Sequence, residues 1–284
     1  MKFIKDIIKG VMMGVANIIP GVSGGTMAVS MGIYDDIISS ITNLFSQFKK
    51  SIKTLLPYII GMGLGLVGLS FIIKFLLANY SLPTNFAFIG LILGGLPILF
   101  GRLKGSKINI AHGIVFLLFF ALIIGLQLLG GGDETGVVIK LTALEVVKLF
   151  FIGVIASATM VIPGVSGSMI LMILGYYSPI IDYVTKFIKA LAAFDMTQML
   201  DCAAILVPFG IGVVIGIFAI AKLIEFLLNR YESLTYSAIL GLVIASPFAI
   251  LMSAGIAGLT VGTIVVSAIT FAIGFAVAYV LGRE

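Results

Sequence analysis

The most informative stretch of this chain is Pro163-Gly164-Val165-Ser166-Gly167-Ser168, because almost the same sequence occurs earlier as Pro20-Gly21-Val22-Ser23-Gly24-Gly25. Both copies lie in the middle of long apolar runs. A Pro-Gly break exposes backbone groups that lipid cannot hydrogen-bond, so it is tolerated at membrane depth only inside protein or beside a water-filled cavity. Two such breaks at corresponding positions are the best sequence indicator of a transporter's binding site.

Composition indicates a membrane protein. Of the 284 residues, 61% are hydrophobic and only 10% are charged, whereas about a quarter of a soluble domain is charged. Several windows exceed the ~18 apolar residues that indicate a spanning helix. We therefore predict an all-α polytopic membrane protein with a single membrane domain over residues 1–284.

The sequence gives little support to other functional classes. The single cysteine, Cys202, excludes a disulfide framework and a cysteine-rich metal site. No basic stripe interleaved with aromatic residues suggests nucleic-acid binding. The net charge of +5 is ordinary for a membrane protein. We predict no cofactor, no metal and no nucleic-acid partner.

The two motifs mark an internal repeat. Aligning Pro20 with Pro163 also aligns the pairs Ser23/Ser166, Gly32/Gly175 and Tyr34/Tyr177. A second block, with an offset larger by eight residues, consists of Pro57/Pro208, Gly61/Gly212, Gly65/Gly216, Tyr80/Tyr231, Thr84/Thr235 and Gly90/Gly241. One insertion around residues 185–200 explains the change of offset. The chain thus divides into related halves, 1–132 and 140–284, joined by the glycine-rich tract 130–134.

Each half has the same order of segments. A short apolar segment leads into the motif (4–19 and 144–162), and a more polar one follows it (24–46 and 167–190). Three stronger spans come next (54–79, 84–101 and 109–129; then 203–228, 235–253 and 259–281). The first pair is too short or too polar for ordinary spans. We interpret each pair as a re-entrant helical hairpin, followed by three transmembrane helices.

The distribution of charge predicts the topology. With a cytoplasmic N-terminus, the basic clusters at 49–53 and 102–107 lie inside, and so do Arg230 and Arg283. Both termini are then cytoplasmic. Lysines 140, 186 and 189 are exceptions to this pattern. Three crossings per half is an odd number, so the halves are expected to be inverted, although full crossing by the hairpin segments predicts the same.

The motif has the chemistry of an anion site. Pro20 and Pro163 end a helix, and Gly21 and Gly164 supply the turn. Ser23 and Ser166 are then expected to be N-caps of a second half-helix. Its N–H groups would remain approachable beside the glycines at 24, 25 and 167, and free N–H groups at a helix start attract anions. The predicted hydroxyl ligands of a phosphate are Ser23, Thr26, Ser166 and Ser168. The alternative is a packing kink between helices.

A few further polar residues are candidates for the same site. Asn17, one turn before Pro20, either satisfies carbonyls freed by the proline or faces the cavity. Lys74, Arg102 and Glu225 are possible accessory charges, because ionisable residues inside membranes are functional candidates. We favour a structural explanation for two of them: Lys74 can snorkel to the membrane surface, and Glu225 can pair with Lys222.

Residues 17–26 (Asn-Ile-Ile-Pro-Gly-Val-Ser-Gly-Gly-Thr), echoed by residues 161–168, resemble the bacterial polyprenyl-phosphate transporter family (PopT) over essentially the whole chain. The resemblance implies a translocase for undecaprenyl phosphate, the lipid carrier of cell-wall synthesis, in the bacterial cytoplasmic membrane. It also implies that the partner is a polyprenyl-phosphate lipid. The motif residues carried over are Pro20, Gly21, Ser23, Gly24, Gly25, Thr26, Pro163, Gly164, Ser166, Gly167 and Ser168.

Two alternatives remain. Undecaprenyl-diphosphate phosphatases resemble this plan, but their motif continues with arginine and they carry paired glutamates. Here Gly167 follows Ser166, and no Glu-x-x-x-Glu occurs. The other alternative is a carrier of a small anion, because a helix-terminus site does not by itself require a lipid tail.

Overall fold

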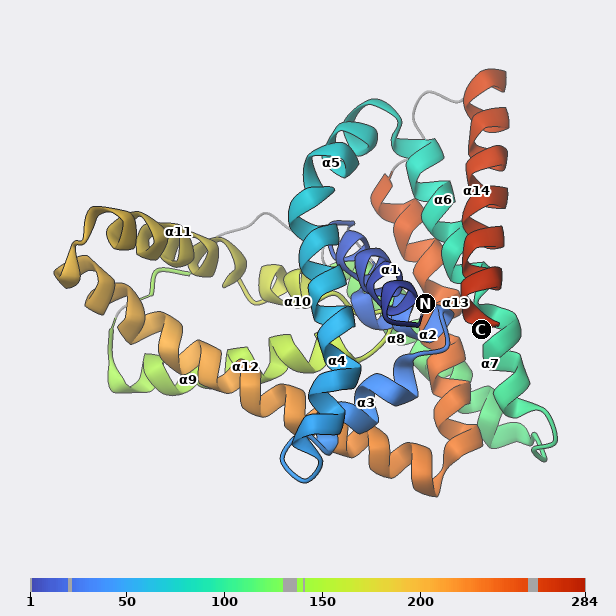
Figure 1. Ribbon diagram of the computed structural model, residues 1–284, viewed down its shortest axis with the longest axis horizontal. Coiled ribbons are helices and arrows are strands. Elements are labelled where there is room, and N and C mark those ends of the chain that lie inside the picture. Colours follow the sequence, from blue (N-terminus) through green and yellow to red (C-terminus); the bar gives the residue numbers. More distant parts are fainter. Residues whose placement is uncertain (1, 20–21, 130–136, 140, 255–259, 284) are drawn as a thin grey trace. The chain divides into compact units, whose positions relative to one another are not determined.

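The structure is a computed structural model that describes residues 2–19, 22–129, 137–139, 141–254 and 260–283. Within these ranges the chain forms helices and no strand, which confirms the all-α prediction (Figure 1). The helices are α1 Lys2–Ala16, α2 Gly24–Ser30, α3 Tyr34–Thr42, α4 Phe48–Gly63, the π-helix η1 Leu64–Gly68, α5 Ser70–Asn79, α6 Ser81–Gly94, α7 Leu96–Leu103, α8 Ile110–Leu129, α9 Ala143–Val161, α10 Gly167–Ile173, α11 Tyr177–Ala193, α12 Met196–Arg230, α13 Glu232–Ala254 and α14 Val261–Gly282.

Length and hydropathy confirm a multi-pass membrane protein. In the described part, seven helical stretches are long and apolar enough to span a membrane. Six of them correspond to the six predicted spans. The seventh, α9, was predicted to be one arm of a hairpin; with 19 residues it is longer than its counterpart α1, which has 15. Helices α10 and α11 form a bent pair with an angle of 112°.

The helices form two compact units. Unit 1 contains Met1–Gln127, Ile162–Val165 and Ala221–Glu284, and unit 2 contains Leu128–Val161 and Ser166–Ile220. The boundary therefore cuts the second motif after Val165, and the units do not coincide with the two sequence halves.

In unit 1, α1 packs against α4 along a line of glycines. A Cβ added to Gly10 would overlap the Tyr58 carbonyl, one at Gly61 would overlap the Ile7 carbonyl, and one at Gly65 would overlap the Val11 carbonyl. Small residues let helix backbones approach in this way in membrane proteins.

Unit 2 repeats this contact between α9 and α12. A Cβ at Gly153 would overlap the Phe209 carbonyl, and one at Gly212 would overlap the Phe150 carbonyl. In the alignment of the two halves, Gly153 and Phe150 correspond to Gly10 and Ile7. Gly212 and Phe209 correspond to Gly61 and Tyr58. The packing of the first long helix against the hairpin arm is thus the same in both halves.

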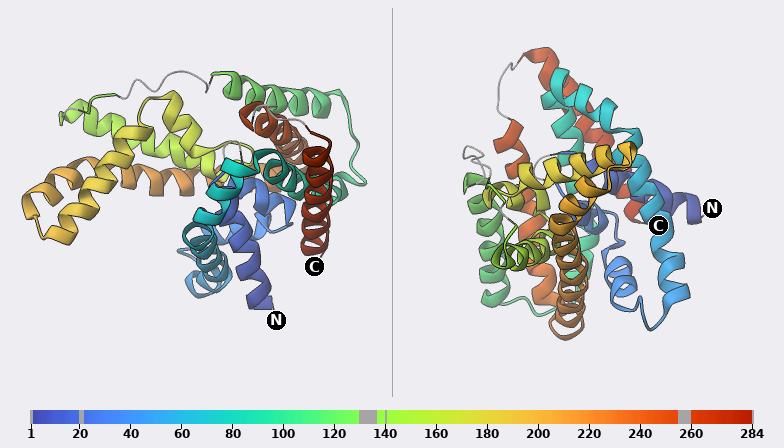
Figure 2. Two further views of the ribbon diagram at one scale, coloured as in Figure 1. Left: turned by 90° about the horizontal axis from the view of Figure 1, so that it is seen from above. Right: turned by 90° about the vertical axis from the view of Figure 1, so that its left-hand side faces the viewer.

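Two further pairs of helices join the halves within unit 1. Gly90 of α6 allows contact with the Phe271 carbonyl of α14, and its aligned partner, Gly241 of α13, allows contact with the Phe116 carbonyl of α8. Helices α6 and α14 lie side by side in every view (Figures 1 and 2). Each half therefore contributes its last helix to the other, which explains why the units and the sequence halves differ.

The more polar segment of each predicted hairpin is two helices rather than one. The break falls at Gly32 and at its aligned partner Gly175, which have φ of +68° and +76°, a conformation that favours glycine. Helix α3 has nine residues and α11 has 17, and the end of α11 overlaps the region 185–200 in which the insertion was predicted.

The first long span also differs from its prediction. The region predicted as one helix over 54–79 is divided into α4, η1 and α5, whereas its aligned region is the continuous 35-residue helix α12. A π-helix inserts extra backbone into an α-helix and commonly marks a bend.

Candidate functional site

The described residues of the first motif lie at and just before the start of α2, in unit 1. Pro20 and Gly21 lie outside the described residues. Ser23 is the N-cap of α2, and its Oγ accepts a hydrogen bond from the Thr26 N–H at 3.2 Å. The Asn17 Oδ1 accepts a hydrogen bond from the Gly24 N–H at 2.9 Å. The predicted capping role of Ser23 is confirmed, and Asn17 supplies a second cap rather than satisfying carbonyls.

The second motif meets the first at Thr26. The Gly164 N–H donates to the Thr26 Oγ1 at 2.7 Å, although the two residues are 138 positions apart. The same hydroxyl lies 3.0 Å from the Ser23 Oγ. Gly164 has φ +80°, and a Cβ there would lie 2.8 Å from the Leu242 carbonyl oxygen. Its predicted role as the turn residue is therefore confirmed.

These groups are buried and satisfied. Ser23 is 3% exposed, Thr26 is fully buried, and Gly24, Gly25 and Pro163 are also buried. Contrary to the expectation of approachable N–H groups, those of Gly24, Thr26 and Gly164 are each bonded to a side-chain oxygen. The reason is that short polar side chains of the motif itself reach these donors. Any anion at this place must exchange with those oxygens.

The remainder of the second motif lies in unit 2 and is more open. Ser166 stands at the N-cap position of α10, but its side chain makes no capping hydrogen bond. Its Oγ is instead 2.7 Å from the Ser168 Oγ, and both residues are partly exposed. Gly167 packs closely, since a Cβ there would lie 3.0 Å from the Ala156 carbonyl oxygen. Of the two motifs, only the second has hydroxyls that reach the surface.

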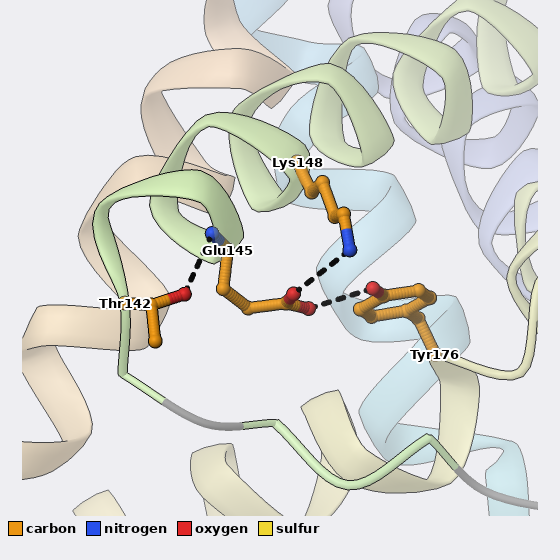
Figure 3. A network of polar contacts seen from close by, with 4 residues as sticks. All are labelled: Thr142, Glu145, Lys148 and Tyr176. Carbon is orange, nitrogen blue, oxygen red and sulfur yellow. Dashed lines mark hydrogen bonds and ion pairs between the residues drawn. The ribbon is translucent and has the colours of Figure 1, made fainter.

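The other end of the second hairpin carries a polar network (Figure 3). The Glu145 carboxylate accepts a hydrogen bond from the Tyr176 hydroxyl at 2.7 Å and forms an ion pair with Lys148 at 3.3 Å. Thr142 caps the start of α9 by accepting the Glu145 N–H at 3.3 Å. Because Tyr176 follows α10 and Glu145 begins α9, this network ties the two arms together.

The three predicted accessory charges lie at different places. Lys74 is exposed on α5, as expected for a snorkelling residue. The Glu225 carboxylate accepts a hydrogen bond from Asn43 at 3.5 Å, and no ion pair joins it to Lys222 in the described part of the chain. The Arg102 guanidinium is 2.9 Å from the Asp35 carboxylate.

The partners of Arg102 were not predicted. The Tyr236 hydroxyl donates to Asp35 at 2.6 Å, and Arg102 lies over the Tyr236 ring at 5.7 Å. Burial raises the pKa of the adjacent Tyr34 far above its usual value, and the Asp35 carboxylate adds to this effect. The only signal in the sequence was an aspartate inside an apolar segment, because Asp35, Arg102 and Tyr236 are far apart in the chain.

The chain is similar to several known proteins. Residues 13–263 and 204–282 match a family model described as undecaprenyl phosphate translocase-like. The chain is 34% identical to a polyprenyl-phosphate transporter of Staphylococcus aureus (strain NCTC 8325 / PS 47), over 98% of this chain and 95% of that protein. It is 28% identical to a polyprenyl-phosphate transporter of Vibrio cholerae serotype O1, over 87% of this chain and 77% of the other. No solved structure matches the chain.

Proposed function

This chain belongs to the undecaprenyl phosphate translocase-like family, and from that premise we propose that it moves undecaprenyl or a related polyprenyl phosphate between the leaflets of the bacterial cytoplasmic membrane. The lipid carrier would thereby be recycled for cell-envelope synthesis. The names of the two relatives support the substrate class, and the multi-pass helical architecture supports the setting.

The observation that carries the proposal is the hydrogen bond between the motifs. Thr26 of the first motif accepts the Gly164 N–H of the second at 2.7 Å, so the repeated motif contributes to one buried polar cluster from both halves of the sequence. A buried cluster of this kind at a break between helices is where transporters bind charged substrates. If these buried side chains only packed the helices together, apolar side chains would serve equally well.

In this proposal, phosphate oxygens replace the oxygens of Asn17, Ser23 and Thr26 as acceptors of the backbone N–H groups. The two hydroxyls then become donors to the phosphate. Each neutral hydrogen bond would be exchanged for a charge-assisted one, which is roughly twice as strong. Helices α2 and α10 have only seven residues each, so local donors matter more here than a helix dipole.

Access to this cluster requires movement. Ser23 and Thr26 are buried, and α2 packs against α1, α3, α6 and α7, so some of these contacts must open before a phosphate can reach the two hydroxyls. Ser166 and Ser168 are partly exposed and are proposed to donate their hydroxyls to the phosphate of the lipid. We further propose that both termini are cytoplasmic and that the halves are inverted.

Reconstitution tests the proposal directly. The purified protein in liposomes is expected to move polyprenyl phosphate between leaflets and to release no phosphate from the corresponding diphosphate. Clear phosphate release by the purified protein would instead identify a phosphatase. Equal transport of a small anion without any prenyl phosphate would identify an anion carrier.

A further inference from the structure

The cluster of Asp35, Arg102 and Tyr236 joins three helices of unit 1. Asp35 lies in the first turn of α3, Arg102 in the last turn of α7, and Tyr236 near the start of α13. The Asp35 Oδ2 is 2.9 Å from the Arg102 guanidinium and accepts a hydrogen bond from the Tyr236 hydroxyl at 2.6 Å. These two contacts hold the start of α3 against one helix from each half of the sequence.

The start of α3 is coupled to α2 by a tight turn. The Ile33 N–H donates to the Ala28 carbonyl at 2.9 Å, and the Gly32 N–H donates to the Val29 carbonyl at 3.0 Å. Gly32 has φ +68°. These two bonds form a Schellman motif, which closes the end of a helix. A displacement of Asp35 is therefore transmitted to α2, the helix that begins within the first motif.

Helix α2 is covered on all sides in this arrangement. All seven of its residues, 24–30, are buried, and it packs against both α6 and α7. At its end Ser30 is fully buried, and a Cβ added to Gly95, between α6 and α7, would overlap the Ser30 backbone. While Asp35 holds α3 on α7, the hydroxyls of Ser23 and Thr26 therefore stay closed to a phosphate.

The contacts of Asp35 are incomplete. Both partners bond to its Oδ2, whereas its Oδ1 is buried without a hydrogen-bond partner among the described residues. A buried acceptor without a partner makes the closed state less stable. The Arg102 side chain is 46% exposed, so water and salt screen the ion pair. The cluster is therefore a contact that can be broken and formed again.

The surroundings of Asp35 make Arg102 important. A cavity of about 340 Å³ adjoins Asp35 and Tyr236, and two further carboxylates, Glu225 and Glu232, line it as well. Like charges repel one another, so Asp35 stays in this place because the guanidinium compensates its charge. The cavity also leaves space into which the side chain can turn when the ion pair breaks.

The second half of the sequence has no such ion pair. In the alignment of the halves, Asp35 corresponds to Ser178, and continuing the second block places Ser253 opposite Arg102. The half without the two charges is also the half whose motif hydroxyls, those of Ser166 and Ser168, are partly exposed. Burial of the motif thus occurs together with the charged cluster.

We propose that Asp35, Arg102 and Tyr236 form a latch that keeps α2 closed over the hydroxyls of the first motif, and that release of Asp35 from Arg102 opens this motif. The three are positioning residues, which act on the motif through α3 and α2. The inference rests on the proposed function, because it takes the phosphate of the lipid as the group that the open motif admits. The latch itself can be measured without any substrate.

The test measures how often α2 becomes exposed. Ser30→Cys in a Cys202→Ala background gives the full chain a single thiol, at a fully buried position of α2 outside the motif. Its rate of reaction with N-ethylmaleimide, an uncharged reagent, reports the open fraction. Asp35→Asn is expected to raise this rate about three- to tenfold, because a charge-assisted contact is lost but is partly screened by water. Asp36→Asn, at the exposed neighbouring carboxylate, is the control and should change the rate by less than about twofold.

Tyr236→Phe tests the hydrogen bond alone. It removes one hydroxyl and keeps the ring beneath Arg102, and it too should raise the labelling rate. Tyr231→Phe, at an exposed tyrosine, is its control. Arg102→Gln should also raise the rate, and the double variant with Asp35→Asn should label no faster than the faster single variant, because both changes remove the same contact.

The dependence on salt separates a latch from a general loosening of the fold. Sodium chloride screens a partly exposed ion pair, so labelling of the reporter with an intact latch should become at least about twofold faster at high salt. Labelling of Asp35→Asn should not respond. This measurement needs no change at the latch, so it remains decisive where a variant folds poorly.

Equal labelling rates in the latch and control variants, or a rate that ignores salt in the intact protein, would overturn the latch. If the wild-type protein also transports polyprenyl phosphate, only the latch is then wrong. If the latch variants label faster but the wild type does not transport polyprenyl phosphate, the proposed function fails and the latch controls access for another molecule.

Discussion

At the residue scale, Thr26 is the link between the two motifs. Its hydroxyl accepts the Gly164 N–H and contacts the Ser23 hydroxyl, and the side chain is fully buried. A valine has nearly the same shape but has no hydroxyl, so it tests the hydrogen bond with little change in packing.

We expect Thr26→Val to lower the free energy of unfolding by about 1–3 kcal/mol, because the Gly164 N–H is left buried without an acceptor. The same variant should also transport less polyprenyl phosphate. Thermal melting and the liposome assay measure the two effects. Thr185→Val, at an exposed threonine of α11, is the control; equal melting of the two variants would show that the link contributes nothing.

The two motif serines differ in a way that separates stability from binding. Ser23 caps α2 through its side chain, whereas Ser166 makes no such bond. We expect Ser23→Ala to cost about 1 kcal/mol of stability and Ser166→Ala to cost much less. Both should weaken polyprenyl-phosphate binding roughly tenfold, because each removes a donor to a charged group worth about 1.5–3 kcal/mol.

Binding and melting of the single and double variants check this prediction. The double variant is expected to be nearly inactive in transport. Wild-type binding and transport by Ser23→Ala with Ser166→Ala would show that the phosphate is held elsewhere.

At the scale of the element, glycines set the distance between helices. Gly61 of α4 touches the Ile7 carbonyl of α1, whereas Gly63, two residues later, has nothing near it. We expect Gly61→Ala to destabilise the protein by about 1–3 kcal/mol, because the added methyl forces the helices apart. Gly63→Ala should be neutral or stabilising by up to about 1 kcal/mol, because alanine favours a helix.

The same comparison is available in unit 2, with Gly212 at a close contact and Gly210 in open space. Melting temperatures of the four alanine variants test both units together. The prediction is contradicted if the variants at positions 61 and 212 melt at or above the wild-type temperature.

At the scale of the whole molecule, inversion of the halves is the main prediction. Tyr80 and Tyr231 occupy aligned positions, and both are exposed. Inverted halves put Tyr80 outside the cell and Tyr231 inside. Single cysteines at these positions, in a Cys202→Ala background, are labelled with a membrane-impermeant maleimide. We expect labelling at position 80 in intact cells and labelling at position 231 only after permeabilisation, whereas labelling of both from one side would indicate parallel halves.

Many structural features of this protein could be predicted by applying local rules to the sequence. Hydropathy determines the membrane setting, and the spacing of repeated residues predicts two related halves. The capping role of Ser23 and the turn at Gly164 are also local, since they depend on a side chain reaching a backbone group three residues away or on the absence of a Cβ. These features could be predicted because no distant segment is needed to produce them.

Only the tertiary structure decided which distant groups meet. The Thr26–Gly164 bond and the Asp35–Arg102–Tyr236 cluster each join segments far apart in the chain. The breaks at Gly32 and Gly175 likewise arise from a backbone conformation that glycine permits but does not require. Hydrophobic pattern specifies which face of a helix is buried, but the partner and register of that face depend on close packing, where a single methyl group decides how near two backbones can lie.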